Sequence, residues 1–341
     1  MEQYVGLDVS MRETSIAVRQ NGKRVWRGKC PSDPKALADV IRQRAPDAVR
    51  VVLETGPLST WLYHALKAEA LPVVCIDARH AKAALDMAPN KTDANDADGL
   101  AQIAEVGFYR EVRVKGYAPM LARTLVGARG QLLRISIQLS NQIRGVMKTF
   151  GLIVPKGAGR VFEAHARALL GTNEAVARVV LPLLEAWRAV RARAAELDRQ
   201  LIAAARTSPA CRRLMTIPGV GAVTAASFVA AVEAPENFGT SRAVGAWLGL
   251  TPRRYQSGEA DYDGHISRRG DGHLRALVYE AAAAVLTRTR TDSALRSWGL
   301  RLKEKVGFKR AAVAVARKLA VIMHAMLKTG ASFEPAPKTT A

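Results

Sequence analysis

The sequence has little cysteine, few acidic residues and no long apolar run. Its three cysteines, Cys30, Cys75 and Cys211, stand singly among 341 residues, so we expect neither a disulfide framework nor a Cys-x-x-Cys metal motif. No apolar stretch approaches the roughly 18 residues of a membrane-spanning helix. Charged and polar residues interrupt the start of the chain, which argues against a secretory signal. We therefore expect a protein of the reducing cytoplasm with no membrane partner.

Acidic residues are scarce relative to basic ones. The chain has 51 Lys and Arg against 30 Asp and Glu, a formal net charge of +21. From residue 112 to residue 162 there is no Asp or Glu, although nine Lys and Arg occur there. A solvated helix face usually mixes the two signs, whereas an excess of cations is typical of proteins that bind nucleic-acid phosphates. We expect a nucleic-acid partner and association with the nucleoid.

Four carboxylates have the placement of a metal site. Asp8 and Glu54 each follow a short apolar run, and the carboxyl ends of buried strands are the usual ligand site of an α/β sheet. Asp93 and Asp96 are three residues apart at the start of a helical stretch and so share one face. Any one of them alone would be read as a turn, surface or helix-start acid. Together they favour Mg²⁺ or Mn²⁺, since clustered carboxylates need cations and these ions prefer oxygen ligands.

The first 115 residues have the pattern of an α/β domain. The two residues Asn21-Gly22 predict a tight hairpin turn between two strands. Periodicity predicts strands at 3–9, 13–19, 23–30, 50–54 and 72–76, and helices at 34–45, 58–69, 78–86 and 93–106. The order βββαβαβα is that of a ribonuclease-H-like (RuvC-like) fold, in which Asp8, Glu54 and the late acidic pair would meet.

The middle segment, residues 116–207, is predicted to be two long basic helices. They span about 119–149 and 173–206 and are separated by a break rich in Gly and Pro. Such a pair suggests an antiparallel arm or a coiled-coil contact between protomers. The candidate nucleic-acid contacts in this segment are Arg123, Arg129, Arg134, Arg144 and Lys148.

The last segment, residues 208–331, is predicted to be mostly helical, with helices at about 273–290 and 307–329 and a disordered tail at 332–341. Residues 214–221, followed by a helix at 222–232, resemble a helix-hairpin-helix, although an ordinary packing turn fits equally well. Ser257 and Ser267 are expected on a loop that could hold a phosphodiester near a hydroxyl, although serine is also a common turn residue. The basic candidates here are Arg253, Arg254, Arg268, Arg269 and Arg275.

Taken in order, short motifs along the whole chain resemble the DEDD transposases of bacterial insertion sequences, which are bridge-RNA-guided recombinases. Each motif alone is weak, but the ordered set is specific. The matching pieces are Gly6-Leu7-Asp8-Val9-Ser10, Leu53-Glu54-Thr55-Gly56, Lys91-Thr92-Asp93 with Asp96-Ala97, Ile217-Pro218-Gly219-Val220-Gly221, Gly249-Leu250-Thr251-Pro252, Gln256-Ser257-Gly258 and Ile266-Ser267-Arg268-Arg269-Gly270.

The resemblance implies a division of labour along the chain. A RuvC-like domain would supply Asp8, Glu54, Asp93 and Asp96 as metal-binding catalytic acids, a coiled coil would join protomers into a dimer or tetramer, and Ser257 would attack DNA. An RNA from the element would select both the element ends and the target. Asp98 is a further nearby acid that leaves the choice of the last ligand open.

Two alternatives remain open. One is a RuvC-like metal-dependent nuclease acting on branched DNA, with Ser257 a bystander. The other is a non-catalytic nucleic-acid-binding protein on a degenerate ribonuclease-H scaffold, against which the intact set of acids argues.

Overall fold

The computed structural model describes residues 1–86, 92–171 and 173–335, and the chain forms two compact units, Met1–Gly116 and Tyr117–Ala341. Lys91 of the predicted motif and most of the predicted tail lie outside the described residues. In the parts of the chain that are described, no helix is both long and apolar enough to cross a membrane.

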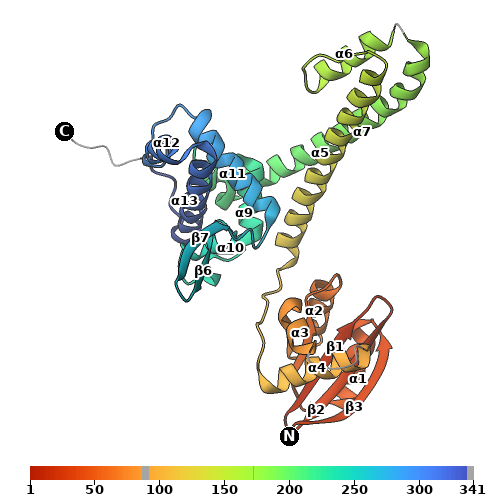
Figure 1. Cartoon of the computed structure of the whole chain (residues 1–341). Helices are drawn as coiled ribbons and strands as arrows, with labels where there is room; N and C mark the ends of the chain where they lie inside the picture. Colours follow the sequence, from red (N-terminus) through yellow and green to blue (C-terminus); the bar gives the residue numbers. More distant parts are fainter. Residues whose placement is uncertain (87–91, 172, 336–341) are drawn as a thin grey trace, which may run out of the picture. The chain divides into compact units, whose positions relative to one another are not determined.

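The first unit, red to orange in Figure 1, is built on a five-stranded sheet with the order β3-β2-β1-β4-β5. Its strands are β1 (Gln3–Val9), β2 (Glu13–Gln20), β3 (Lys23–Pro31), β4 (Ala48–Glu54) and β5 (Val73–Ile76). β1, β2 and β3 are antiparallel neighbours, whereas β1, β4 and β5 run parallel. Asn21 and Gly22 both have positive φ, 51° and 76°, as the predicted hairpin turn requires. The mixed α/β prediction for this unit is confirmed.

Helices cover both faces of this sheet because its central strands are apolar on both sides. Val5 and Leu7 of β1 pack with helices α1 (Pro34–Arg44) and α2 (Ser59–Ala68). On the other face, Val52 of β4 packs with α3 (Ala78–Leu85) and α4 (Asp93–Val106). Because side chains alternate along a strand, even-numbered residues of β1 and β4 face α4.

Gly6 allows α4 to lie directly on β1. A Cβ atom at this position would lie 2.1 Å from the carbonyl oxygen of Ala97 and 2.4 Å from the amide nitrogen of Ala101. Both are backbone atoms, so neither can move aside alone. The absence of a side chain at Gly6 therefore sets the distance between the helix and the sheet.

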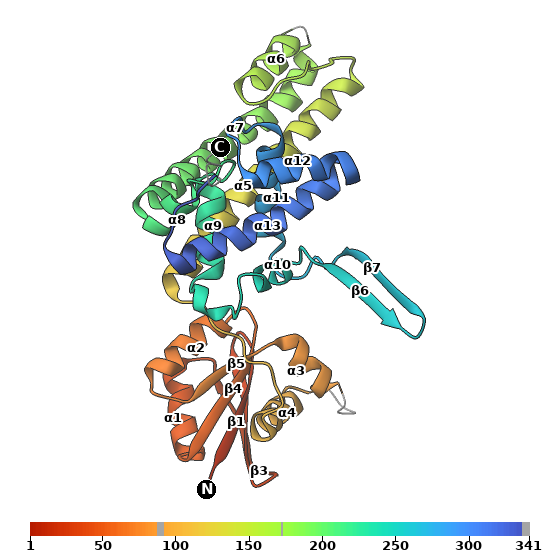
Figure 2. The same cartoon turned by 90° about the vertical axis from the view of Figure 1, so that its left-hand side faces the viewer.

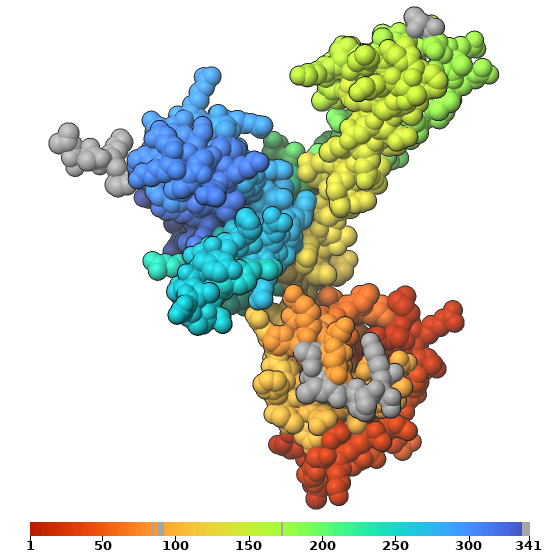
Figure 3. All heavy atoms as spheres, viewed as in Figure 1, coloured from red at the N-terminus to blue at the C-terminus, as the bar shows by residue number. Residues whose placement is uncertain are grey.

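The second unit begins with two long helices that form an arm. α5 (Tyr117–Thr149) and α7 (Glu174–Thr207) lie side by side, and α6 (Arg160–Leu170) covers their far ends (Figures 2 and 3). The end of α5 shares a small core with the start of α7, through Met147 and Val180, whereas the start of α5 shares the main core with the end of α7. The helices are therefore antiparallel, as one of the two predictions had it. Helix α6 was not predicted.

The rest of the second unit is a helical body around one large core. Its elements are α8 (Pro209–Leu214), α9 (Ala222–Val232), the 3₁₀ turn η1 (Pro235–Asn237), α10 (Ala243–Trp247), α11 (Gly272–Thr287), α12 (Ala294–Val306) and α13 (Phe308–Thr329). Gly219, in the turn between α8 and α9, has φ of 89°, and a Cβ there would lie 2.8 Å from the carbonyl oxygen of Ala281. This glycine packs on α11, which favours a packing turn over a phosphate-binding helix-hairpin-helix.

The prediction that Ser257 lies in a loop is wrong. Residues Pro252–Ser257 and Ala260–Ile266 form an antiparallel hairpin, β6 and β7. Both strands are exposed along nearly their whole length. A strand with no buried face has no apolar alternation, and for that reason the periodicity of the sequence did not indicate it.

We predict that Gly6→Ala destabilises the first unit by about 1–3 kcal/mol, because the added methyl group would push α4 away from β1. Urea unfolding followed by circular dichroism measures this. Gly56→Ala is the control, since a Cβ there meets no atom within 4 Å, and it should change stability by less than about 0.5 kcal/mol. Equal unfolding midpoints for the two variants would contradict the contact.

Candidate active site

Asp8 and Glu54 lie next to each other at one edge of the sheet. Leu7 of β1 is paired with Leu53 of β4 in a parallel register, so the residue after each leucine comes at the same level. Asp8 comes two residues after Gly6, and Glu54 comes two residues after Val52. Because alternate residues of a strand share a face, both acids lie on the face of the sheet that α4 covers. Both are half-buried, and both make polar interactions in the structure.

The first turn of α4 brings the second pair of acids to this edge. Thr92 caps the helix, its hydroxyl accepting a hydrogen bond of 3.2 Å from the amide of Asn95. Asp96 directly precedes Ala97, whose carbonyl lies on Gly6, so Asp96 is close to the end of β1. Asp93 is more exposed and forms an ion pair of 3.3 Å with Lys29 of β3. The lysine was not recognised in the sequence because β3 is far from α4 along the chain.

The donor set at this edge consists of carboxylate oxygens only, which suits hard divalent ions such as Mg²⁺ or Mn²⁺. Among the described residues, no group of three or more His, Cys, Asp or Glu side chains is already close enough to hold a metal ion. The fold thus places Asp8 beside Glu54 and packs α4 on β1, but the described residues do not gather the four acids into a coordination shell.

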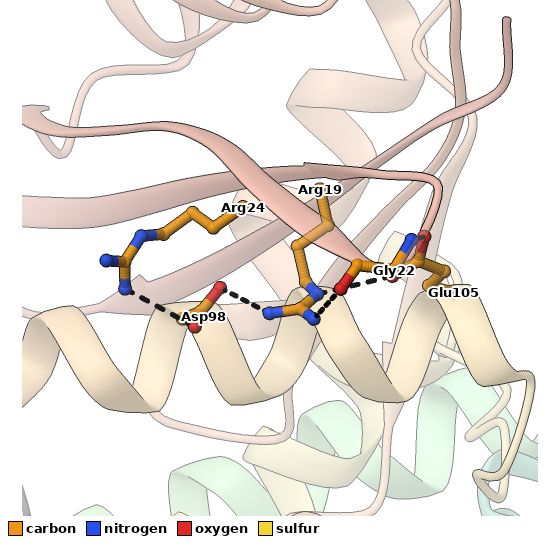
Figure 4. A network of polar contacts seen from close by, with 5 residues as sticks. All are labelled: Arg19, Gly22, Arg24, Asp98 and Glu105. Carbon is orange, nitrogen blue, oxygen red and sulfur yellow. Dashed lines mark hydrogen bonds and ion pairs between the residues drawn. The ribbon is translucent and has the colours of Figure 1, made fainter.

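Asp98, the further candidate, belongs to a different cluster (Figure 4). It forms ion pairs of 3.0 Å with Arg19 and 3.4 Å with Arg24, on the β2–β3 hairpin. Arg19 also pairs with Glu105 at 3.2 Å, and Glu105 accepts a hydrogen bond of 2.6 Å from the amide of Gly22. These contacts fix α4 to the β2–β3 hairpin at two points, Asp98 and Glu105. Asp98 therefore helps to position the helix that carries Asp93 and Asp96.

The cysteines offer no reactive thiolate to this unit or the other. All three are buried. Burial raises the pKa of Cys75 to about 11, and it also raises the pKa values of Cys30 and Cys211 above the ordinary range. These thiols stay protonated at neutral pH, which argues against a cysteine nucleophile.

In the second unit, Ser257 and Ser267 occupy opposite ends of the β6–β7 hairpin. Ser257 ends β6 beside the turn and is exposed. Ser267 is half-buried just after β7, where its amide donates a hydrogen bond of 2.8 Å to the carbonyl of Thr251. Ser257 is therefore open to a large substrate, whereas Ser267 belongs to the base of the hairpin.

The base of the hairpin is a close crossing of two chain segments. A Cβ at Gly249 would lie 2.4 Å from the backbone nitrogen of Arg269, and one at Gly270 would lie 2.1 Å from the carbonyl oxygen of Trp247. Arg275 of α11 holds the two segments together, since its guanidinium donates to the carbonyls of Leu248 at 3.0 Å and Arg269 at 2.8 Å.

Several predicted nucleic-acid contacts have partners within the protein. The Arg129 guanidinium pairs with Asp198 at 2.5 Å, and Arg123 pairs with Asp271 at 3.3 Å. Arg144 lies 4.6 Å from the ring centroid of Phe162 and donates to three backbone carbonyls of residues 154–157. Arg129, Arg144 and Arg275 therefore have structural roles. The candidates that remain exposed are Arg123, Arg134, Lys148, Arg253, Arg254, Arg268 and Arg269.

A cavity of about 510 Å³ lies between α5, α9 and the start of α11. Its lining includes Arg123, Arg134, Asp271 and His273. Both arginines belong to α5, whereas the helical body contributes Asp271 and His273. The sequence did not indicate this cavity, because its lining residues are up to about 150 positions apart.

Comparison with known proteins identifies the class of enzyme. Residues 5–151 match a family model described as a transposase, that of the DEDD transposases of IS110. Residues 211–297 match a second model, described as the transposase IS116/IS110/IS902 family. The first model spans the acids of the sheet edge, and the second spans the hairpin with Ser257. The chain is a DNA transposase.

Individual relatives agree with the family models. The chain is 32% identical over 287 residues to the transposase for insertion sequence element IS1111A of Coxiella burnetii, covering 81% of this chain and 77% of that protein. It is 33% identical to a probable family 20 transposase of Pseudomonas aeruginosa, with 72% and 75% covered. An uncharacterized 44.8 kDa protein of insertion element IS116 of Streptomyces clavuligerus is 23% identical over 99% of this chain. The chain belongs to the IS116/IS110/IS902 family of transposases.

We predict opposite effects for two neighbouring acids of α4. Asp98→Asn should lower the stability of the first unit by about 1–3 kcal/mol, because it weakens the contacts of two arginines, while the folded enzyme still cleaves DNA. Asp96→Asn should cost less than about 1 kcal/mol and abolish cleavage. Urea unfolding and cleavage of labelled DNA measure the two effects. Loss of cleavage in a fully stable Asp98→Asn variant would instead make Asp98 the last ligand.

Proposed function

We propose that this transposase is an RNA-guided site-specific recombinase that cuts and rejoins DNA strands through acids of the first unit and a serine of the second. The observation that carries the catalytic part is the meeting of Asp8, Glu54 and the start of α4 at one sheet edge. Strand pairing joins β1 to β4, and a close backbone contact joins β1 to α4, about 90 residues further along the chain. We place this activity at the nucleoid of a bacterial cytoplasm.

Asp8, Glu54, Asp93 and Asp96 would hold the divalent ions. Transposases of the DEDD type depend on such ions, and Mg²⁺ or Mn²⁺ fits the oxygen donors here. Bound ions would polarise a phosphodiester and stabilise the charge that develops on its oxygens. Lys29, which pairs with Asp93 at 3.3 Å, is positioned to hold that carboxylate and to offset part of the negative charge before an ion binds.

Ser257 is the proposed nucleophile. Its exposed place at the end of β6 supports this role, because a DNA strand can reach its hydroxyl. The Ser257 oxygen would form a bond to the phosphorus, and the bond between that phosphorus and one DNA oxygen would break. The proton lost by the serine would end on the released DNA hydroxyl. The serine hydroxyl is a weak nucleophile, so a metal or a base must activate it. The acids of the first unit of this chain or of a partner chain would supply that activation.

A covalent protein–DNA link would also distinguish a recombinase from the alternative, a RuvC-like nuclease. A serine–DNA phosphodiester conserves the bond for rejoining, whereas a RuvC-like nuclease acting on branched DNA transfers the phosphate to water. The non-catalytic alternative does not agree with membership in a transposase family.

We predict that Ser257→Ala abolishes formation of a protein–DNA adduct and lowers recombination by at least about 10³-fold, the order of effect expected when a nucleophile is lost. Ser267→Ala is the matched control, ten residues away in the same hairpin, and should keep the adduct. Denaturing gel electrophoresis of labelled DNA after brief reaction measures both. Adducts that persist in Ser257→Ala and vanish in Ser267→Ala would move the nucleophile, and cleavage without any adduct would favour the nuclease.

The guide RNA and the assembly of protomers complete the proposal. The acid-free segment from residue 112 to residue 162 supports RNA binding, with exposed cations such as Arg134 and Lys148 on α5. Base pairing would carry the sequence information while the protein holds the backbone. At the tip of the arm, Phe150, Ile153 and Val179 are 58%, 70% and 58% exposed. Exposed apolar side chains at one place support a contact that joins protomers into a dimer or tetramer. Only Val179 of the three lies on a helix, so the coiled-coil form of this contact rests on the family resemblance.

We predict that the protein purified from cells carrying the flanks of its gene contains one structured RNA from those flanks. Ribonuclease treatment should abolish recombination, and adding the transcribed RNA back should restore it. Sequencing of the bound nucleic acid identifies the RNA. A protein that is free of RNA and still recombines its DNA after ribonuclease treatment would show that the basic residues contact only DNA.

A further inference from the structure

The β6–β7 hairpin has two chemically different faces. Tyr255 of β6 is paired directly with Tyr262 of β7, and paired residues share a face of the ribbon. Ser257 comes two residues after Tyr255 and so lies on this same face. The carboxylates of Asp261 and Asp263 alternate with Tyr262 along β7 and belong to the opposite face. The proposed nucleophile thus shares its face with two aromatic rings.

The two rings stack on each other and remain partly exposed. Their centroids are 5.2 Å apart and their planes differ by 21°, which is a stacked arrangement. Tyr255 is 46% exposed and Tyr262 is 59% exposed. Gly264 on the same face leaves room for this arrangement, since a Cβ there would lie 2.9 Å from the edge of the Tyr255 ring. A cross-strand aromatic pair also stabilises the hairpin itself, but that role does not require the exposed outer surfaces.

The opposite face is unsuited to a polyanion. Arg254 of that face forms an ion pair of 2.6 Å with Asp261, which satisfies its charge within the hairpin. Asp263 adds a second carboxylate there, and no core covers it, since the residue is exposed. Phosphates would be repelled from these acids, so a nucleic acid has reason to approach the tyrosine face. The hairpin stands out from the helical body of its unit (Figure 2), and the exposed fractions of the two tyrosines show that their face is not covered.

We propose that Tyr255 and Tyr262 form a stacking platform for an unpaired DNA base next to the phosphate that is presented to Ser257. Residues two apart on a strand are about 7 Å apart, so one nucleotide can contact a ring and the serine together. Stacking on a ring tolerates any base, because every base has a π face. The tyrosines would therefore fix the position of the strand without reading its sequence. This inference rests on the proposed role of Ser257 and adds the residues that hold its substrate.

Photocrosslinking tests the platform without depending on strand cleavage. The full-length protein, with its co-purified RNA, is mixed with a DNA duplex that spans the junction between the element end and its flank. Thymines near the junction are replaced one at a time by 5-iodouracil, which crosslinks to stacked aromatic side chains on irradiation. The Ser257→Ala variant is used alongside the native protein, because it keeps both tyrosines and cannot form the proposed adduct.

The expected result is a crosslink to Tyr255 or Tyr262 from a position beside the junction, in the native protein and in Ser257→Ala alike. Tyr262→Thr should lose any crosslink at position 262, reduce the crosslink to Tyr255 and weaken binding of the DNA by about tenfold, in line with the loss of one stacked base. Asp263→Thr is the matched control, a neighbouring residue on the same strand but the opposite face. It should keep the crosslink and bind DNA at least as tightly as the native protein, because it removes a carboxylate.

Crosslinks only to other residues, or equal DNA binding by Tyr262→Thr and Asp263→Thr, would overturn the platform. A crosslink that is kept while Ser257→Ala still forms adducts would leave the platform standing and remove the serine from its proposed role. The failure of the one proposal is thus distinguishable from the failure of the other.

Discussion

The contact between Gly6 and the backbone of α4 is the constraint on which the acidic edge depends. β1 and β4 place Asp8 and Glu54 side by side through their register, but the remaining acids come from a helix that has to be brought to the same point. With no side chain at Gly6, the carbonyl of Ala97 lies directly against the strand. The ion pairs of Asp98 and Glu105 with Arg19 then fix the helix along the β2–β3 hairpin. Residues that are not candidate metal ligands, namely Gly6, Asp98 and Glu105, therefore position the helix that carries two of the acids.

Arginine serves two purposes in this chain, and only the structure separates them. Arg144 donates to three backbone carbonyls and Arg275 to two, and each thereby holds a loop in place. A planar group with five donors suits this task better than lysine. Arg268 and Arg269, at the base of the hairpin, remain exposed. The high net charge therefore overstates the number of cations that are available to a nucleic acid.

Most of the first unit could be predicted from the sequence because its signals are local. Apolar runs ending in acids indicated β1 and β4, and Asn21-Gly22 fixed the hairpin turn. The partner of Asp98 could not be predicted, since Arg19 is 79 residues away. Helix α6 was missed because it is short and follows a break rich in glycine. The β6–β7 hairpin was missed because no core lies beneath it to impose an apolar alternation.

The two halves of the proposed active site are held in different ways, and this difference has a consequence for the reaction. The acids are placed by a buried sheet and a close-packed helix, which give a fixed geometry. Ser257 is carried by a two-stranded ribbon, and such ribbons are marginally stable unless something packs on them. The crossing at Gly249 and Gly270 anchors only the base of this ribbon. If the hairpin holds DNA as proposed, its far end would gain order from the bound strand, which would bring the serine to a defined position.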